Sequence, residues 1–202
     1  MKNAIVDVIN LSWPTVVIVV SIVIIMRVAY IIRNDRKTFR LYEELFNLVF
    51  IVYLLVLFEL VTSQDLIGGG TNLIPFKEIL RYDIMSMAFL KQVIGNILLF
   101  VPLGYFVSHY CKLRGIVGIT IVSLLSSTTI EITQHFIGRS VDIDDVILNV
   151  VGGIIGFLLY KLMRKIEEKL PKVFRRKWFY NLVSIAVIIL ISVYLTNTLG
   201  GI

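Results

Sequence analysis

Three polar residues near the end of a long apolar run have the spacing of one helix face. Glu131, Gln134 and His135 lie at positions i, i+3 and i+4, which are neighbours on the surface of an α-helix. Ionisable groups within apolar runs are costly and are usually functional. Glu131 is the deepest of the three and is a candidate general acid or base, and His135 is a second candidate base.

A second polar stripe opens the next apolar run. Asp142, Asp145 and Asn149 lie at i, i+3 and i+7, and the same face continues with Gly152 and Gly156. Small residues with this spacing let two membrane helices approach closely. We therefore expect this run to pack tightly against the preceding one, with its acidic end beside the first polar group.

Two interpretations of the acidic residues stay open. Carboxylate oxygens are the ligands that Mg²⁺ and Ca²⁺ take, so Glu131, Asp142 and Asp145 are candidate ligands of a divalent cation. Alternatively the cluster is structural, with Asp142 as a helix N-cap and Arg139 paired with a carboxylate.

The elements that position these residues are predicted to be membrane-spanning helices. The chain has 202 residues, of which 57% are hydrophobic, against about 45–50% in an ordinary soluble domain. Its mean hydropathy is +0.88. A spanning helix needs about 20 mostly apolar residues, and six runs approach this length: 13–32, 45–62, 94–110, 115–136, 146–163 and 182–199. The expected fold is an all-α polytopic membrane helix bundle with about six spans.

The Lys and Arg residues indicate how the spans are oriented. Fourteen of them lie in alternate connecting loops, including eight within residues 161–177, and five lie in the other loops. Because positively charged loops stay in the cytoplasm, we expect a multi-pass membrane protein with both termini outside. This orientation brings Glu59 and Asn96 to the same outer depth as the two polar stripes. The 161–177 stretch is either a lipid-facing basic segment or a topology signal alone.

The composition also argues against several classes of protein. The net charge is +6 and the isoelectric point is about 9.5, but the basic residues cluster between apolar runs, which disfavours a nucleic-acid partner. Cys111 is the only cysteine, so the chain can form neither an internal disulfide nor a cysteine-based metal site.

The long outer loop, residues 63–93, contains a predicted amphipathic helix at 76–87. Its apolar residues recur at helical spacing, and its charged residues fall on the other face. The apolar residues are Phe76, Ile79, Leu80, Ile84 and Met87, and the charged ones are Lys77, Glu78 and Arg81. We expect this helix either to lie in the outer membrane interface or to pack on the bundle as a lid.

Four blocks of sequence resemble the VanZ-like family. They are NLIPF at 72–76, GNILLFVPLG at 95–104, the pair Glu131-x-x-Gln134, and the Gly-, Asp- and Asn-rich block at 138–156. By this resemblance the motif positions are Asn72, Pro75, Asn96, Pro102, Glu131, Gln134, Arg139, Asp142, Asp145 and Asn149. The resemblance implies a membrane core at 45–162, flanked by additions at 1–44 and 163–202. It also implies a location in the bacterial cytoplasmic membrane and an association with teicoplanin resistance, and it brings no settled catalytic reaction.

Two functions are weighed. In the first, the outer polar cluster binds a membrane lipid, a lipid-linked cell-wall precursor or a lipoglycopeptide, and thereby lowers susceptibility to antibiotics such as teicoplanin. Its predicted ligand-binding residues are Asn72, Asn96, Glu131, Gln134, Arg139, Asp142, Asp145 and Asn149. In the second, the chain is a membrane-embedded hydrolase or transferase that acts on a lipid-linked substrate, with or without a divalent cation at the carboxylates. A transporter is disfavoured, because the two halves show no inverted repeat.

Overall fold

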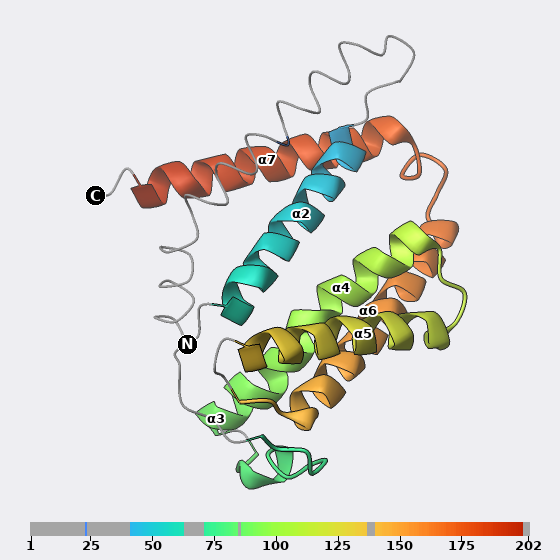
Figure 1. Cartoon of the computed structure of the whole chain (residues 1–202). Helices are drawn as coiled ribbons and strands as arrows, with labels where there is room; N and C mark the ends of the chain where they lie inside the picture. The colour runs from blue at the N-terminus through green and yellow to red at the C-terminus, as the bar shows by residue number, and fades with distance from the viewer. Residues whose placement is uncertain (1–22, 24–40, 63–70, 85, 137–139, 200–202) are drawn as a thin grey trace. The chain divides into compact units, whose positions relative to one another are not determined.

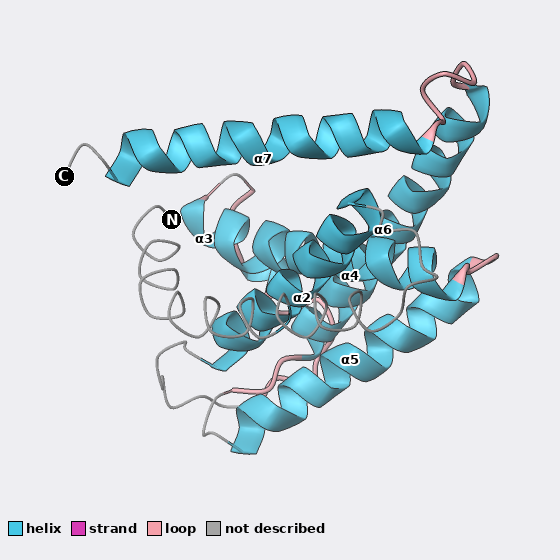
Figure 2. Ribbon diagram, turned by 90° about the horizontal axis from the view of Figure 1, so that it is seen from above, coloured by secondary structure: helices cyan, strands magenta, loops and turns pink. Residues whose placement is uncertain are grey.

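The described part of the chain is built from helices. The computed structural model describes residue 23 and residues 41–62, 71–84, 86–136 and 140–199. The long helices in these ranges are α2 (Leu41–Thr62), α4 (Gly95–Cys111), α5 (Ile116–Phe136), α6 (Ile143–Lys169) and α7 (Lys177–Leu199), as Figure 1 shows. Figure 2 shows helices and loops and no strand among the described residues; the one extended pairing there is an isolated bridge between Asn72 and Asp142.

Three short elements precede α4. A 3₁₀ turn covers Ile79–Arg81, α3 covers Met87–Phe89, and a π-helical turn covers Leu90–Ile94. Ser86 caps α3, since its side-chain oxygen accepts the backbone N–H of Phe89 at 3.1 Å. The helical run therefore continues from Met87 to the end of α4.

Four of the predicted spans are confirmed as helices long and apolar enough to cross a membrane. Within the described residues these are Leu41–Glu59, Met87–Cys111, Ile116–Phe136 and Ile143–Lys169. The last predicted run, 182–199, lies within the helix α7. The predicted run at 13–32 lies outside the described residues, so the total of six spans stays a prediction.

The chain divides into two compact units. Of the described residues, those between 55 and 164 form one unit, and residues 41–54 together with 165–199 belong to the other. In the second unit the start of α2 contacts the start of α7: the backbone N–H of Tyr42 donates to Oδ1 of Asn181 at 3.3 Å, and the rings of Tyr42 and Tyr180 are 5.4 Å apart. Tyr180 also donates its hydroxyl to Glu167 near the end of α6, at 3.1 Å.

Glycines bring the helices of the first unit into close contact. A Cβ on Gly152 of α6 would meet the backbone of Ile97 in α4, and one on Gly156 would meet the backbone of Val101 and Gly104. Gly153 faces both Gly104 of α4 and the side chain of Ser123 in α5. The close packing predicted for the glycine stripe is thus present, but its main partner is α4 and not α5 as expected, because periodicity identifies a face without identifying what covers it.

Residues 76–87 do not form the single amphipathic helix that their spacing predicts. Phe76 has a left-handed backbone conformation, with φ 65°, and the described residues that follow it form turns and one 3₁₀ turn. The backbone N–H groups of Phe76, Glu78 and Ile79 instead turn towards a buried carboxylate of α6, as described below. The apolar side chains are nevertheless largely exposed, with Leu80 at 81% and Ile84 at 79%.

Candidate functional site

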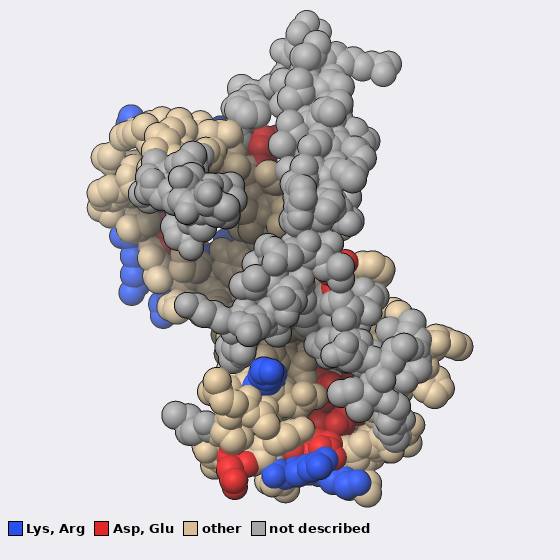
Figure 3. Space-filling view, turned by 90° about the vertical axis from the view of Figure 1, so that its left-hand side faces the viewer, with Lys and Arg blue, Asp and Glu red and all other residues tan. Residues whose placement is uncertain are grey.

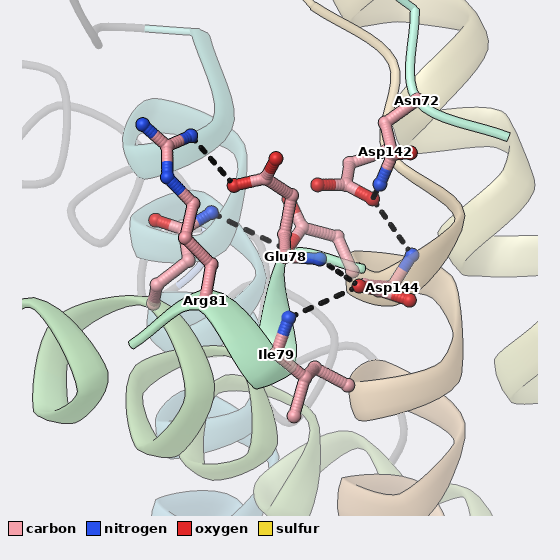
Figure 4. Close-up of polar contacts among 8 residues, drawn as sticks. Asn72, Glu78, Ile79, Arg81, Asp142 and Asp144 are labelled. Carbon is pink, nitrogen blue, oxygen red and sulfur yellow. Dashed lines mark hydrogen bonds and ion pairs between the residues drawn. The ribbon is translucent and has the colours of Figure 1, made fainter. Parts of the chain in front are cut away.

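Asp144, in the first turn of α6, is the centre of the polar end of the first unit. Its side chain is buried, with 1% of its surface exposed. Its two carboxylate oxygens accept the backbone N–H groups of Phe76, Glu78 and Ile79, the last two at 2.8 and 3.1 Å (Figure 4). Hydrogen bonds to a charged acceptor are about twice as strong as neutral ones, so Asp144 anchors the outer loop to α6.

Asn72 and Asp142 form a second connection between the same loop and α6. The backbone N–H of Asn72 donates to Val141 at 2.8 Å, and the N–H of Ile143 donates to the carbonyl of Asn72 at 3.0 Å. The Asn72 amide also donates to Oδ1 of Asp142 at 2.9 Å. The same oxygen accepts the backbone N–H of Asp144 at 2.9 Å, as a helix N-cap does.

Glu131 connects the end of α5 to the start of α6. It is buried, with 4% of its surface exposed, and one of its oxygens accepts the backbone N–H of Asp142 at 2.9 Å. The predicted proximity of Glu131 and Asp142 is therefore confirmed. This contact is structural, because it stabilises a backbone group that the helix itself leaves without a partner.

Asp145 faces α4 and the π-helical turn that precedes it. Oδ1 of Asp145 accepts the amide of Asn96 at 2.5 Å and that of Gln92 at 3.4 Å. Asp145 and Asn96 are half-buried, and Gln92 is exposed. Single π-helical turns occur frequently at functional sites, and this one brings a second amide to the same carboxylate.

Asn149 lies deeper in the bundle. Its amide nitrogen donates to the hydroxyl of Ser127 in α5 at 2.9 Å, and both side chains are buried. It therefore contacts α5, while Asn96 and Asp145 join α4 to α6.

The remaining predicted site residues are Gln134, His135, Arg139 and Glu59. Gln134 is half-buried near the end of α5, while His135 is exposed, with its ring 6.2 Å from that of Phe136. Arg139 lies outside the described residues. Glu59 is half-buried near the end of α2.

Sequence reasoning missed three members of the cluster: Asp144, Gln92 and Ser127. Asp144 lies beside the predicted stripe, one residue from Asp145, so its face of the helix differs by about 100°. The helix face that carries Asp144 is buried because the outer loop covers it. A signal was nevertheless present, since paired carboxylates in a first turn are favoured positions for accepting backbone N–H groups.

The arrangement of the carboxylates bears on the predicted cation site. In the part of the chain that the structure describes, no group of three or more His, Cys, Asp or Glu side chains is placed to hold a metal ion. Glu131, Asp142 and Asp145 each accept a protein N–H instead. The hydrogen bond of Glu131 thus joins α5 to the start of α6, and that of Asp142 joins the outer loop to α6.

Asp142 has a perturbed acidity. Burial raises the pKa of its carboxyl above the ordinary value of 3.8, against the lowering effect of the N–H of Asp144 and the amide of Asn72. At pH values above this ordinary pKa, the folded protein therefore binds more protons at Asp142 than the unfolded chain does. The stability of the folded protein consequently falls as the pH rises through the folded pKa.

This raised pKa predicts that the difference in stability between the native chain and the Asp142→Asn variant depends on pH. The asparagine keeps an oxygen acceptor for Asn72 and Asp144 but does not ionise. The stability of the native chain relative to this variant is expected to fall as the pH is raised from about 4 to 7. Thermal unfolding in neutral detergent at several pH values measures the difference, and a difference that is constant or grows with pH would contradict the assignment.

The two ends of the first unit differ in charge. The loop end carries the acidic cluster, and Figure 3 shows acidic side chains there with basic ones beside them; Arg81 and Glu78 form an ion pair of 3.2 Å. The other end of α4 leads into a short link containing Lys112 and Arg114, without acidic residues. A 17-residue helix separates the two ends by about 25 Å, which is close to the thickness of a bilayer's hydrocarbon core.

These features define a helical membrane protein with a polar cluster at one end of its bundle. Comparison with known proteins then identifies the group within that class. The family model described as VanZ/LLP1 matches residues 16–164, and the chain belongs to this family.

Among characterised relatives, the chain is similar to Protein VanZ of Enterococcus faecium. The two are 34% identical over 110 residues, which is 53% of this chain and 65% of the relative. The chain thus covers slightly less than two thirds of that relative's length. No solved structure matches the chain.

Proposed function

We propose that this protein lowers the susceptibility of the bacterial cell envelope to lipoglycopeptides such as teicoplanin, by binding a lipid-tailed or lipid-linked ligand at its polar end. The similarity to Protein VanZ supports the resistance role. The observation that carries the binding role is the junction of polar and apolar groups at this end of the bundle.

The polar half of this junction is the group formed by Asp145, Asn96 and Gln92. It joins two helices at a partly exposed position, and its amides and carboxylate can exchange hydrogen bonds with sugar, peptide or phosphate groups. By the resemblance, Gln134 and Arg139 belong to the same site. Arg139 would supply the positive charge that a phosphate requires.

The apolar half is the exposed loop. Its large apolar side chains are mostly exposed: those of Leu73, Ile74, Phe76, Leu80 and Ile84 are each exposed at 53–81%. Apolar groups of this kind beside a membrane enter its interface. They offer an apolar wall for the acyl or polyprenyl chain of a ligand whose head contacts the polar half.

The experiment is a susceptibility assay in a Gram-positive host. Cells that express the chain should show a higher inhibitory concentration of teicoplanin, and an unchanged one for a glycopeptide without an acyl tail. Asp145→Ala should return the teicoplanin value to that of the host, because it removes the acceptor shared by Asn96 and Gln92. Asp83→Ala, which removes the same charge from an exposed position outside these contacts, is the matched control.

Equal membrane levels of the variants must be shown by immunoblotting. If Asp145→Ala then protects as well as the native chain does, this polar group is not the binding site. If the native chain protects equally against the glycopeptide without a tail, the proposed recognition of a lipid tail is wrong.

The orientation follows from the same proposal, since the polar end must face outward to meet these ligands. Two contacts of α7 support this orientation: the start of α7 contacts both the start of α2 and the end of α6. A fusion of alkaline phosphatase to the C-terminus is expected to be active, and an inactive fusion would invert the orientation.

A further inference from the structure

We infer that residues Pro171–Trp178, which run from the link after α6 into the first turn of α7, form a binding site for the phosphate headgroups of anionic phospholipids. The segment has the sequence PKVFRRKW, in which four of eight residues are basic and none is acidic. All eight residues are exposed. This basic turn lies in the second unit, so the proposal is independent of the function assigned to the polar end of the first.

The basic turn is folded rather than extended. The N–H of Phe174 donates to the carbonyl of Pro171 at 3.0 Å, and the N–H of Arg176 donates to Val173 at 3.3 Å. The N–H of Phe179 then donates to Arg176 at 3.0 Å, at the start of α7. A topology signal needs only charge in any conformation, whereas these turns hold the cations in a short, defined segment.

Aromatic rings support the same segment. The rings of Phe174 and Phe179 are 5.0 Å apart in an edge-to-face arrangement, and that of Trp178 is 6.1 Å from Phe179. Trp178 is 49% exposed and Phe174 is 41% exposed. Aromatic side chains beside Lys and Arg are typical of the membrane interface, where the rings enter the headgroup layer.

The positive charge of the basic turn favours lipids with anionic headgroups. The anionic headgroups of a cytoplasmic leaflet attract basic segments, and each Lys or Arg near the surface contributes about a fivefold change in affinity. Arg175 and Arg176 each present a planar guanidinium that can hold two phosphate oxygens at once. Zwitterionic headgroups carry a compensating cation and should bind more weakly.

Trp178 provides a direct reporter of this binding. The chain has two tryptophans, and Trp13→Phe leaves Trp178 as the sole one. We would purify this full chain in neutral maltoside detergent and titrate it with phosphatidylglycerol carrying brominated acyl chains, which quench nearby tryptophan. Brominated phosphatidylcholine is the comparison lipid. Because a detergent micelle has no sides, any effect of charge on membrane insertion is removed.

Phosphatidylglycerol is expected to quench Trp178 at lower concentration than phosphatidylcholine does. Arg175→Gln with Arg176→Gln should raise the half-quenching concentration of phosphatidylglycerol about 25-fold, whereas Arg175→Lys with Arg176→Lys should retain most of the preference. The matched control, Lys77→Gln with Lys91→Gln, removes two exposed cations elsewhere and should change nothing. Circular dichroism verifies that each variant keeps its helices.

Two results would overturn the proposal. The first is equal quenching by the two lipids, or a preference that survives the double glutamine variant. The second is displacement of phosphatidylglycerol by millimolar inorganic phosphate or glycerol phosphate, which would show that the turn binds free phosphate rather than a lipid headgroup.

Discussion

Replacing Gly104 with alanine is expected to destabilise the first unit, because the added methyl group meets the backbone of a neighbouring helix. A Cβ at this position in α4 would fall on the carbonyl oxygen of Gly153 in α6, with the carbonyl carbon at 2.8 Å and the Cα at 2.9 Å. These atoms belong to a helix backbone, so no side chain can rotate away. The two helices would have to separate, and the neighbouring contacts at Gly152 and Gly156 would weaken with them.

Two effects oppose each other in this substitution. Alanine is favoured over glycine within a helix by about 1 kcal/mol, which would stabilise α4. Overpacking of a filled contact costs about 1–3 kcal/mol and occasionally more. A clash with backbone atoms should cost close to the upper value of this range, because backbone atoms cannot rotate away. We therefore expect a net loss of about 1–2 kcal/mol and a clearly lower unfolding temperature in detergent.

Gly115→Ala is the matched control for this prediction. Gly115 precedes α5, and a Cβ there would meet nothing within 4 Å. The same chemical change at this position should leave the unfolding temperature nearly unchanged. If Gly104→Ala and Gly115→Ala unfold at the same temperature, α4 and α6 do not approach as closely as described.

The glycine contacts also show which parts of the fold could be predicted from sequence. The length of the apolar runs predicted the helices now seen at α2, α4, α5 and α6, because a bilayer fixes how many apolar residues a span needs. The small-residue stripe predicted a close helix contact. It could not predict that Ile97, Val101 and Gly104 of α4 take part in that contact, because the spacing of small residues does not indicate which helix faces them.

The polar end shows the same limit at the level of single residues. Helical spacing placed Glu131 and Asp142 at adjoining helix ends, and a hydrogen bond between them is present. The same spacing favoured Asp145 over Asp144, yet Asp144 is the buried carboxylate. The difference is made by the outer loop, whose position depends on hydrogen bonds from its own backbone and therefore leaves no side-chain pattern to detect.

Asp144→Asn is expected to release the outer loop from the bundle. One oxygen of the native carboxylate accepts the N–H of Phe76, and the other accepts those of Glu78 and Ile79. An asparagine keeps a single acceptor oxygen and directs an NH₂ group at the remaining N–H donors. A hydrogen bond to a charged group contributes about 1.5–3 kcal/mol, and because the loop can rehydrate once it opens, we expect a total loss of about 2–4 kcal/mol.

Trypsin measures this release, because the loop contains Lys77 and Arg81 close to the affected N–H groups. The rate of cleavage follows the population of the open loop when opening is fast, so a loss of 2 kcal/mol corresponds to about a 30-fold faster cleavage of the purified protein in detergent. Hydrogen exchange of the amides of Phe76, Glu78 and Ile79 should accelerate in parallel.

Asp145→Asn is the control that separates loop attachment from charge. It removes the same charge from the same first turn of α6, so the interaction with the helix dipole is matched. Asp145 accepts the side chains of Asn96 and Gln92 and, among the bonds described, no loop backbone N–H. The loop should therefore stay protected from trypsin in this variant, even though the proposed ligand site is altered. Equal cleavage of the two variants would show that the acidic turn acts through its charge alone, and that Asp144 does not anchor the loop.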